Sequence, residues 1–205
     1  MSLDLREIGF VAGTAVASGL RLYGTVAGLG LMHRLGALQL PGRLEVLAQT
    51  PILVLASALF VVEFVADKVP IVDTVWDAIH TFIRVPAAAV LGFAVLNDVA
   101  EPWRTGAALL CGSIALSTHE LKASTRLALN ASPEPFTNWA ASLSEDLLFG
   151  FVLFLVVKHP VAALVVALVI VGATILLASW IYRGVKRLFA WPDRPAGVPS
   201  APPGR

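Results

Sequence analysis

Two carboxylates, Glu63 and Asp67, stand four residues apart at the end of an apolar stretch. Residues at this spacing lie on the same face of a helix. Two carboxylates that share a cavity could bind a cation or hold one proton between them, because two like charges at close range do not both ionise readily. Alternatively, Asp67 and the following Lys68 only mark the end of the apolar segment. Glu63, one turn deeper, is then the better candidate for an ion ligand.

A second set of ionisable residues has spacings of four, three and four: Asp73, Asp77, His80 and Arg84. On a helix these side chains form a continuous stripe, with the acids before the base, an order that favours side-chain pairs and suits the helix dipole. An Asp–His pair could also bind a metal or relay protons. No recognisable ligand motif surrounds them, so a surface stripe that pairs with itself is the favoured interpretation.

Three basic residues, His119, Lys122 and Arg126, share one helix face at steps of three and four. At the end of an apolar span, the long side chains could extend to lipid headgroups. The alternative is that they pair with the acids of the two preceding sets. Such pairing between helices would hold a bundle together without any role in transport.

A stretch with two prolines runs from Asn130 to Asn138 and interrupts the helical pattern. Asn138, or the threonine before it, is expected to cap the next helix. Glu145 lies about two turns inside that helix, among apolar residues, and is the acid that is hardest to explain as interfacial. Asp146 beside it faces another direction. In the first apolar segment, Arg21 is the matching cation without an evident partner.

These charges are unusual because the chain is so apolar. It has 205 residues, of which 57% are hydrophobic and 14% are charged, and its mean hydropathy is +0.79. Soluble domains carry about 25% charged residues, so this chain needs lipid as part of its solvent. A net charge of +1 provides no basic field for nucleic acid. The single cysteine, Cys111, excludes a disulfide framework and a Cys-rich metal site.

The expected fold class is an all-α integral membrane protein with about six transmembrane helices, because a helix crosses the hydrocarbon with about 20 mostly apolar residues. The candidate spans are residues 8–38, 51–67, 84–97, 103–119, 138–157 and 160–182. The first is too long for one straight span. The third is short, so either the preceding helix completes it or it is re-entrant. Residues 70–83 predict an amphipathic helix. Residues 1–190 are expected to form one membrane domain, and 191–205 a disordered cytoplasmic tail.

Lysine and arginine are divided unequally between the loops that six spans would create. Ten lie on the side of the termini and four on the other, with Arg21 inside the first span. Cytoplasmic loops carry the excess of such residues, so both termini are expected in the cytoplasm. Similar polar segments and proline-containing loops recur in residues 8–97 and 103–185. This recurrence suggests two inverted three-helix repeats with interrupted helices, as in many secondary transporters.

Two long motifs resemble those of an uncharacterised bacterial membrane family, known only as a domain of unknown function. The first runs from Glu63 to Arg84 as EFVADKVPIVDTVWDAIHTFIR. The second has the three basic residues at steps of three and four, then NASPEPFTNW at 130–139, and then the adjacent pair of acids. The resemblance covers most of the chain and implies a multi-pass protein of the bacterial inner membrane with no established activity.

The segment that begins at Glu63 is also weakly similar to the Glu-x-Gly-Asp-Lys-Ser/Thr signature of a family of manganese/calcium–proton exchangers. In that family, acids from two inverted halves line the cation site. Here one extra residue separates Glu63 from the Asp-Lys pair, Ala66 replaces the glycine, and Val69 replaces the hydroxyl residue. The second half has Glu145 and Asp146 but no lysine after them.

The favoured function is a small secondary transporter or channel for a cation, with proton coupling left open. Its candidate ion-binding residues are Glu63, Asp67, Glu145, Asp146, Arg21 and Lys122. The supporting polar residues are Asp73, Asp77, His80, Arg84, His119, Arg126, Asn130 and Asn138. The expected partners are the lipid bilayer and a small ion or solute, and a homo-oligomer is left open. No cofactor is expected, and a metal is undecided.

Two other classes of function remain open. One is a non-catalytic membrane subunit or scaffold, whose charged stripes pair between helices and with a partner protein. The other is an intramembrane enzyme that acts on lipid through His80 or His119. No catalytic motif supports the enzyme, so no enzymatic activity is expected. An anion transporter that uses the basic residues is a variant of the favoured function.

Overall fold

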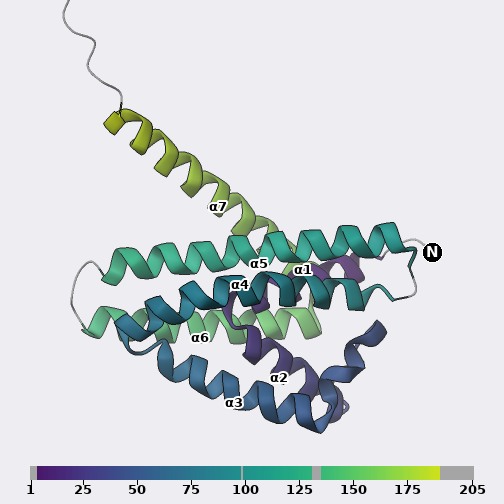
Figure 1. Ribbon diagram of the computed structural model, residues 1–205. Helices are drawn as coiled ribbons and strands as arrows, with labels where there is room; N and C mark the ends of the chain where they lie inside the picture. The colour runs from purple at the N-terminus through teal and green to yellow at the C-terminus, as the bar shows by residue number, and fades with distance from the viewer. Residues whose placement is uncertain (1–3, 98, 131–134, 190–205) are drawn as a thin grey trace, which may run out of the picture. The chain divides into compact units, whose positions relative to one another are not determined.

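Figure 1 shows the computed structural model, which describes residues 4–97, 99–130 and 135–189. The elements in these ranges are α1 (Leu5–Leu20), α2 (Leu22–Arg34), the 3-10 helix η1 (Gly42–Ala48), α3 (Thr50–Ala66), α4 (Pro70–Val95), α5 (Glu101–Asn130), α6 (Pro135–Lys158) and α7 (Pro160–Phe189). No strand occurs in the described ranges. The all-α class is therefore confirmed.

Helix α1 is the central element of the first compact unit, which extends to Thr174. Every residue from Gly9 to Leu20 is buried, and the helix packs against α4, α5 and α6. A helix that is apolar all round is buried in this way. Its glycines permit the close packing: a Cβ added to Gly13 would lie 2.7 Å from Cγ2 of Val156 in α6.

The contact between α1 and α5 at Gly19 has no room for a side chain. A Cβ at this position would lie 2.6 Å from the carbonyl oxygen of Ala115 and 2.7 Å from Cβ of Thr118. We expect Gly19→Ala to lower the free energy of unfolding by about 1–3 kcal/mol, because the helices must separate. Thermal unfolding in detergent measures this effect. The control is Gly106→Ala in α5, where nothing lies within 4 Å; a similar loss there would contradict the explanation.

Two of the predicted spans differ in the structure. The long apolar stretch 8–38 is divided by Arg21, whose extended backbone (φ −146°, ψ 95°) separates α1 from α2. Residues 70–83 and 84–95 are not separate, since both belong to α4, a continuous helix of 26 residues with Pro86 inside it. The short third span is thus completed by the helix before it, the first of the two alternatives left open by its length.

Three helical segments are long and apolar enough to cross a membrane: Val72–Val95, Phe136–Lys158 and Pro160–Arg187. A fourth is added if η1 and α3, which meet at a 72° bend, are counted as one span. Within the described ranges, no other helix is both long and apolar enough to cross a membrane. The number of six spans stays a prediction.

Large apolar side chains cover much of the outer surface of these helices. Phe82 in α4 is 83% exposed, Leu147 in α6 is 71% exposed, and Leu168 in α7 is 64% exposed. Exposed apolar surface on this scale marks contact with a membrane or a partner. Together with the long apolar helices, it suits contact with a lipid bilayer.

The second compact unit begins at Ile175, within α7. Its apolar side chains include Trp180 and Tyr182, which are both exposed. The predicted disordered tail, residues 191–205, lies outside the described residues.

Candidate functional site

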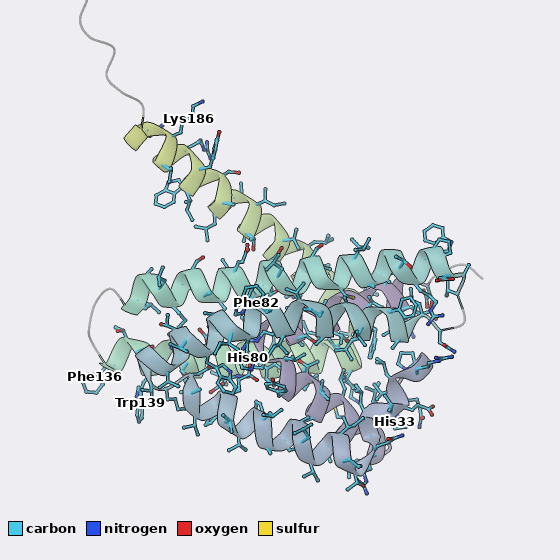
Figure 2. All side chains as sticks on the ribbon, in the orientation of Figure 1. His33, His80, Phe82, Phe136, Trp139 and Lys186 are labelled. Atoms are coloured by element: carbon cyan, nitrogen blue, oxygen red, sulfur yellow. The ribbon has the colours of Figure 1, made fainter. Side chains whose placement is uncertain are left out.

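Eleven charged side chains form one connected network of ion pairs inside the first unit. The acids are Glu63, Asp67, Asp73, Asp77, Glu145 and Asp146, and the bases are Arg21, Lys68, Arg84, Lys122 and Arg126. Lys68, Glu145 and Asp146 are partly exposed, and the other members are buried. The structure thus brings together residues from α3, α4, α5, α6 and the break before α2. Figure 2 draws the side chains of the described residues on the ribbon and labels His80 of α4.

Arg84 lies at the centre of the network and is fully buried. Its Nη2 donates to Oε1 of Glu63 at 2.5 Å, and its Nη1 lies 3.2 Å from Oδ1 of Asp77. Nη1 also lies 2.7 Å from Nδ1 of His119 and 3.4 Å from the carbonyl oxygen of Gly19. That carbonyl is among those left without an intrahelical partner where α1 ends. Arg84 therefore connects four helices through one guanidinium group.

Arg21 binds two carboxylates from the point where α1 ends. Its Nη2 lies 2.7 Å from Oδ2 of Asp67 in the turn after α3. The same nitrogen donates to Oδ1 of Asp146 in α6, and Nζ of Lys68 lies 3.4 Å from the second oxygen of Asp146. The cation that has no evident partner in the sequence is thus paired with two of the predicted ion-binding acids.

Arg126 holds the end of α5 against the beginning of α6. It makes a two-point contact with Glu145, Nε to Oε1 at 2.7 Å and Nη2 to Oε2 at 3.0 Å. It also donates to Oδ1 of Asn138 at 2.6 Å. Asn138 does not cap α6, contrary to the prediction, because the helix begins at Pro135. The side chain of Asn130 lies outside the described residues.

Lys122 is bound by carboxylates from three helices or their ends. Its Nζ lies 3.3 and 3.4 Å from the two oxygens of Asp67 and 3.4 Å from Oδ1 of Asp77. It also lies 3.8 Å from Oε2 of Glu145. The ammonium is therefore the point where the acidic residues of α3, α4 and α6 converge.

His119 is neutral in this arrangement. The guanidinium of Arg84 can only donate, so Nδ1 of His119 is an acceptor. Its Nε2 then carries the hydrogen and faces Oγ1 of Thr81 at 2.7 Å and the carbonyl oxygen of Asp77 at 3.1 Å. The hydroxyl of Thr81 donates in turn to that same carbonyl at 2.9 Å.

His80 contacts no carboxylate of the network within the described residues. Its Nδ1 lies 2.8 Å from the carbonyl oxygen of Trp76 and must donate to it. Its Nε2 can then accept from the hydroxyl of Tyr23 at 3.1 Å. His80 therefore lies outside the ion-pair network, and His119, which contacts Arg84, adds no positive charge to it. Six carboxylates therefore face five cations.

Asp73 is the acid of the network whose negative charge has the weakest contacts with donors and cations. It is 1% exposed, and neither of its carboxylate oxygens has a hydrogen-bond donor among the described residues. Its nearest cation, Nε of Arg126, lies 3.8 Å away. Carboxylate oxygens of Asp67, Asp73 and Asp77 lie within 4.8 Å of one another.

A cavity of about 280 Å³ between α4 and α5 reaches this carboxylate. Its polar lining consists of Asp73, Thr74, Asp77, Thr81, His119, Ser124 and Arg126. A water molecule occupies about 30 Å³ in the liquid, so the cavity has room for a hydrated small ion. Carboxylate and hydroxyl oxygens are the ligands that hard cations prefer.

A family model described as Domain of unknown function (DUF4126) matches residues 8–180. The chain belongs to this family. The resemblance to a family of unknown function is therefore confirmed, and the DUF4126 match includes every member of the ion-pair network. No curated protein and no solved structure matches the chain.

The structure corrects one interpretation of this DUF4126 sequence. Asp73, Asp77, His80 and Arg84 are not a surface stripe, because all four are buried. The apolar face of α4 is turned outward instead, as Phe82 shows by its exposure. This orientation follows when the surrounding solvent is lipid and the charges have partners inside.

The basic residues of α5 face inward as well. Lys122 and Arg126 are buried and paired with acids, so they do not extend to lipid headgroups. The alternative interpretation, pairing with the acids of the two preceding sets, is correct for Lys122. Arg126 lies 3.8 Å from Asp73 but makes its short contact with Glu145 of α6. Sequence reasoning overlooked Thr81, although it lies four residues after Asp77 on the same stripe. It also overlooked Tyr23, for which the sequence gives no signal.

Proposed function

We propose that this DUF4126 chain is a small secondary transporter or channel for a cation, coupled to protons, in which membrane-embedded carboxylates hold the ion. The observation that carries the proposal is the surplus carboxylate Asp73 at the wall of the α4–α5 cavity. A buried ionised group that accepts no hydrogen bond is costly, and the cation nearest to Asp73 lies 3.8 Å away. Asp73 therefore takes up a proton or a cation, and its cavity provides the way in.

The break at Arg21 supports the same function. Secondary transporters bind ions where a helix is interrupted near the middle of the membrane. Here the backbone is extended at Arg21, and Arg84 binds the carbonyl oxygen of Gly19 just before the break. In this proposal the chain crosses the bacterial inner membrane six times, with both termini in the cytoplasm. The inverted halves are residues 8–97 and 103–185.

The geometry changes which acids are proposed to bind the ion. Glu63 and Glu145 are each held by an arginine at short distance, and these pairs serve to position helices. Asp73 has no such partner, and Asp67 and Asp77 lie beside it. These three aspartates are the proposed ion ligands, with Asp73 the one that exchanges a proton for the cation.

Ion flux in proteoliposomes tests the proposal. The vesicles contain a pH-sensitive dye, and Na⁺, K⁺ and other cations are offered outside. We expect the wild type to move one class of cation, and Asp73→Asn to lose at least about nine-tenths of that flux, because a neutral amide neither takes up a proton nor balances a cation. The control is Glu120→Gln, an exposed acid of α5. Wild-type flux in a folded Asp73→Asn protein would contradict the proposal.

The alternative is a non-catalytic membrane subunit or scaffold. The observation that favours it is that each of the five cations of the network contacts a carboxylate. Such pairing fixes helices in place without any ion. This function predicts that a partner protein co-purifies from native membranes in a fixed ratio, and that Asp73→Asn changes neither that ratio nor any flux.

A further inference from the structure

We infer that Lys122 is a tethered counter-ion that competes with the transported cation for the same carboxylates, and that this cation is monovalent. The inference rests on the proposed function and adds the substrate class and the competitor. It begins from the charge count. Six carboxylates face five cations, the contact with Arg84 makes His119 neutral, and His80 pairs with none of these carboxylates, so the network lacks a single positive charge.

The ammonium of Lys122 is held differently from the guanidinium groups. Arg84 and Arg126 approach their carboxylates to 2.5 and 2.7 Å, whereas Nζ of Lys122 lies at 3.3–3.4 Å from Asp67 and at 3.4 Å from Asp77. Guanidinium binds as a rigid planar fork, but ammonium is a point charge on a flexible stem. Lys122 can therefore shift among its acceptors at little cost. If Arg126 shifted, it would lose its two-point contact with Glu145.

Asp73 offers the neighbouring position for a cation. One of its oxygens lies within 4.8 Å of one oxygen of Asp67 and one of Asp77, the acids that bind Lys122. A cation that enters through the cavity reaches Asp73 and Asp77 together, since both line it. It then faces the ammonium across shared carboxylates. Two positive charges that share carboxylates in a buried site repel each other strongly, so the cation and the ammonium of Lys122 each weaken the binding of the other.

The charge count and the lining set the class of cation. A monovalent ion balances the single missing charge, whereas a divalent ion would leave the network positive. Beside the guanidinium of Arg126, the cavity of about 280 Å³ offers carboxylates and the hydroxyls of Thr81 and Ser124, oxygen ligands that suit a hard cation such as Na⁺.

Binding of ²²Na⁺ to the purified full-length protein tests the inference. N-methylglucamine chloride keeps the ionic strength constant. We expect the wild type to bind one Na⁺ per chain and Lys122→Met to bind two, with affinity higher by about tenfold or more, because the repelling ammonium is gone. The control is Lys158→Met. Lys158 is exposed at the end of α6 and belongs to none of the ion pairs of the network, so its removal should leave the stoichiometry at one.

Thermal unfolding keeps the inference testable if Lys122→Met is unstable. Removal of the ammonium leaves Asp67 and Asp77 with one cation fewer, and Na⁺ should replace it. We expect NaCl to raise the Tm of Lys122→Met above its value in N-methylglucamine chloride, by more than it does for the wild type. A variant that binds one Na⁺ or none, or is equally unstable in both salts, overturns the inference.

The two proposals fail in different ways. If wild-type flux exists and Asp73→Asn abolishes it, but Lys122→Met gains neither Na⁺ binding nor Na⁺-dependent stability, only the role of Lys122 is wrong. If the wild type moves no cation but Na⁺ stabilises Lys122→Met as expected, the transport proposal fails. The competition at these carboxylates is then retained.

Discussion

Arg84→Met is expected to lower the free energy of unfolding by about 3–5 kcal/mol, or to prevent folding altogether, because removal of one partner leaves buried charges uncompensated. Arg84 is fully buried and contacts Glu63, Asp77 and His119. Methionine preserves much of the side-chain volume, so the loss reports on charge rather than on a cavity. Unfolding by added SDS in mixed micelles, followed by circular dichroism, measures the change.

A second substitution separates pairing from general damage. Glu63 makes the shortest contact with Arg84 and is left without a cation in Arg84→Met. Glu63→Gln in that background removes this uncompensated charge, so the double variant should be more stable than Arg84→Met alone. The control is Arg34→Met. Arg34 is exposed and its side chain donates to Thr50, so its loss should cost about 1 kcal/mol or less. If Arg84→Met costs no more than Arg34→Met, the network does not hold the helices together.

The helices themselves could be predicted from local patterns. Spacings of three and four place Asp73, Asp77, His80 and Arg84 on one side of a helix, and the structure has them on one side of α4. The pattern could not show which side faces inward. Periodicity only states that two faces differ in polarity, and the direction depends on whether water or lipid surrounds the helix.

Proline bears on two helix boundaries, one left open by the sequence and one misjudged. Pro86 lies inside α4, where residues 70–83 and 84–95 join in one helix. Proline is tolerated inside membrane helices because neighbouring groups satisfy the freed backbone. Pro135 is the first residue of α6, and proline is favoured at that position. That preference could have indicated the true start of the helix, three residues before Asn138.

The partners of the charges lay beyond local reasoning. Arg21 and Asp146 are 125 residues apart in the chain and pair directly. No spacing rule connects them, because their contact depends on how α1 and α6 pack. The sequence could predict which polar residues matter, because an ionisable side chain inside an apolar segment is costly and needs a partner or a function. The surplus of one carboxylate, and its location at Asp73, required the hydrogen bonds of both histidines.

Phe82→Asp is expected to reduce membrane integration of the protein strongly, because a charge at the centre of a membrane helix costs about 2.5–3.5 kcal/mol on insertion scales. Phe82 is 83% exposed and lies in the middle of α4. If this face of α4 were exposed to water, the same change would place a charge in solvent, and the free energy of unfolding would hardly change. The fraction of protein that resists alkaline extraction from membranes measures integration.

The matched control is Phe136→Asp, because Phe136 is equally exposed, at 86%, but lies in the first turn of α6 (Figure 2). An acid there meets the positive end of the helix dipole and, at a helix end, the polar headgroup region, so integration should stay near the wild-type level. The difference between these two variants depends on depth, which only a bilayer provides. Equal integration of both would show that the outer face of α4 does not contact lipid. The inward orientation of its charged stripe would then need another partner to cover the apolar face.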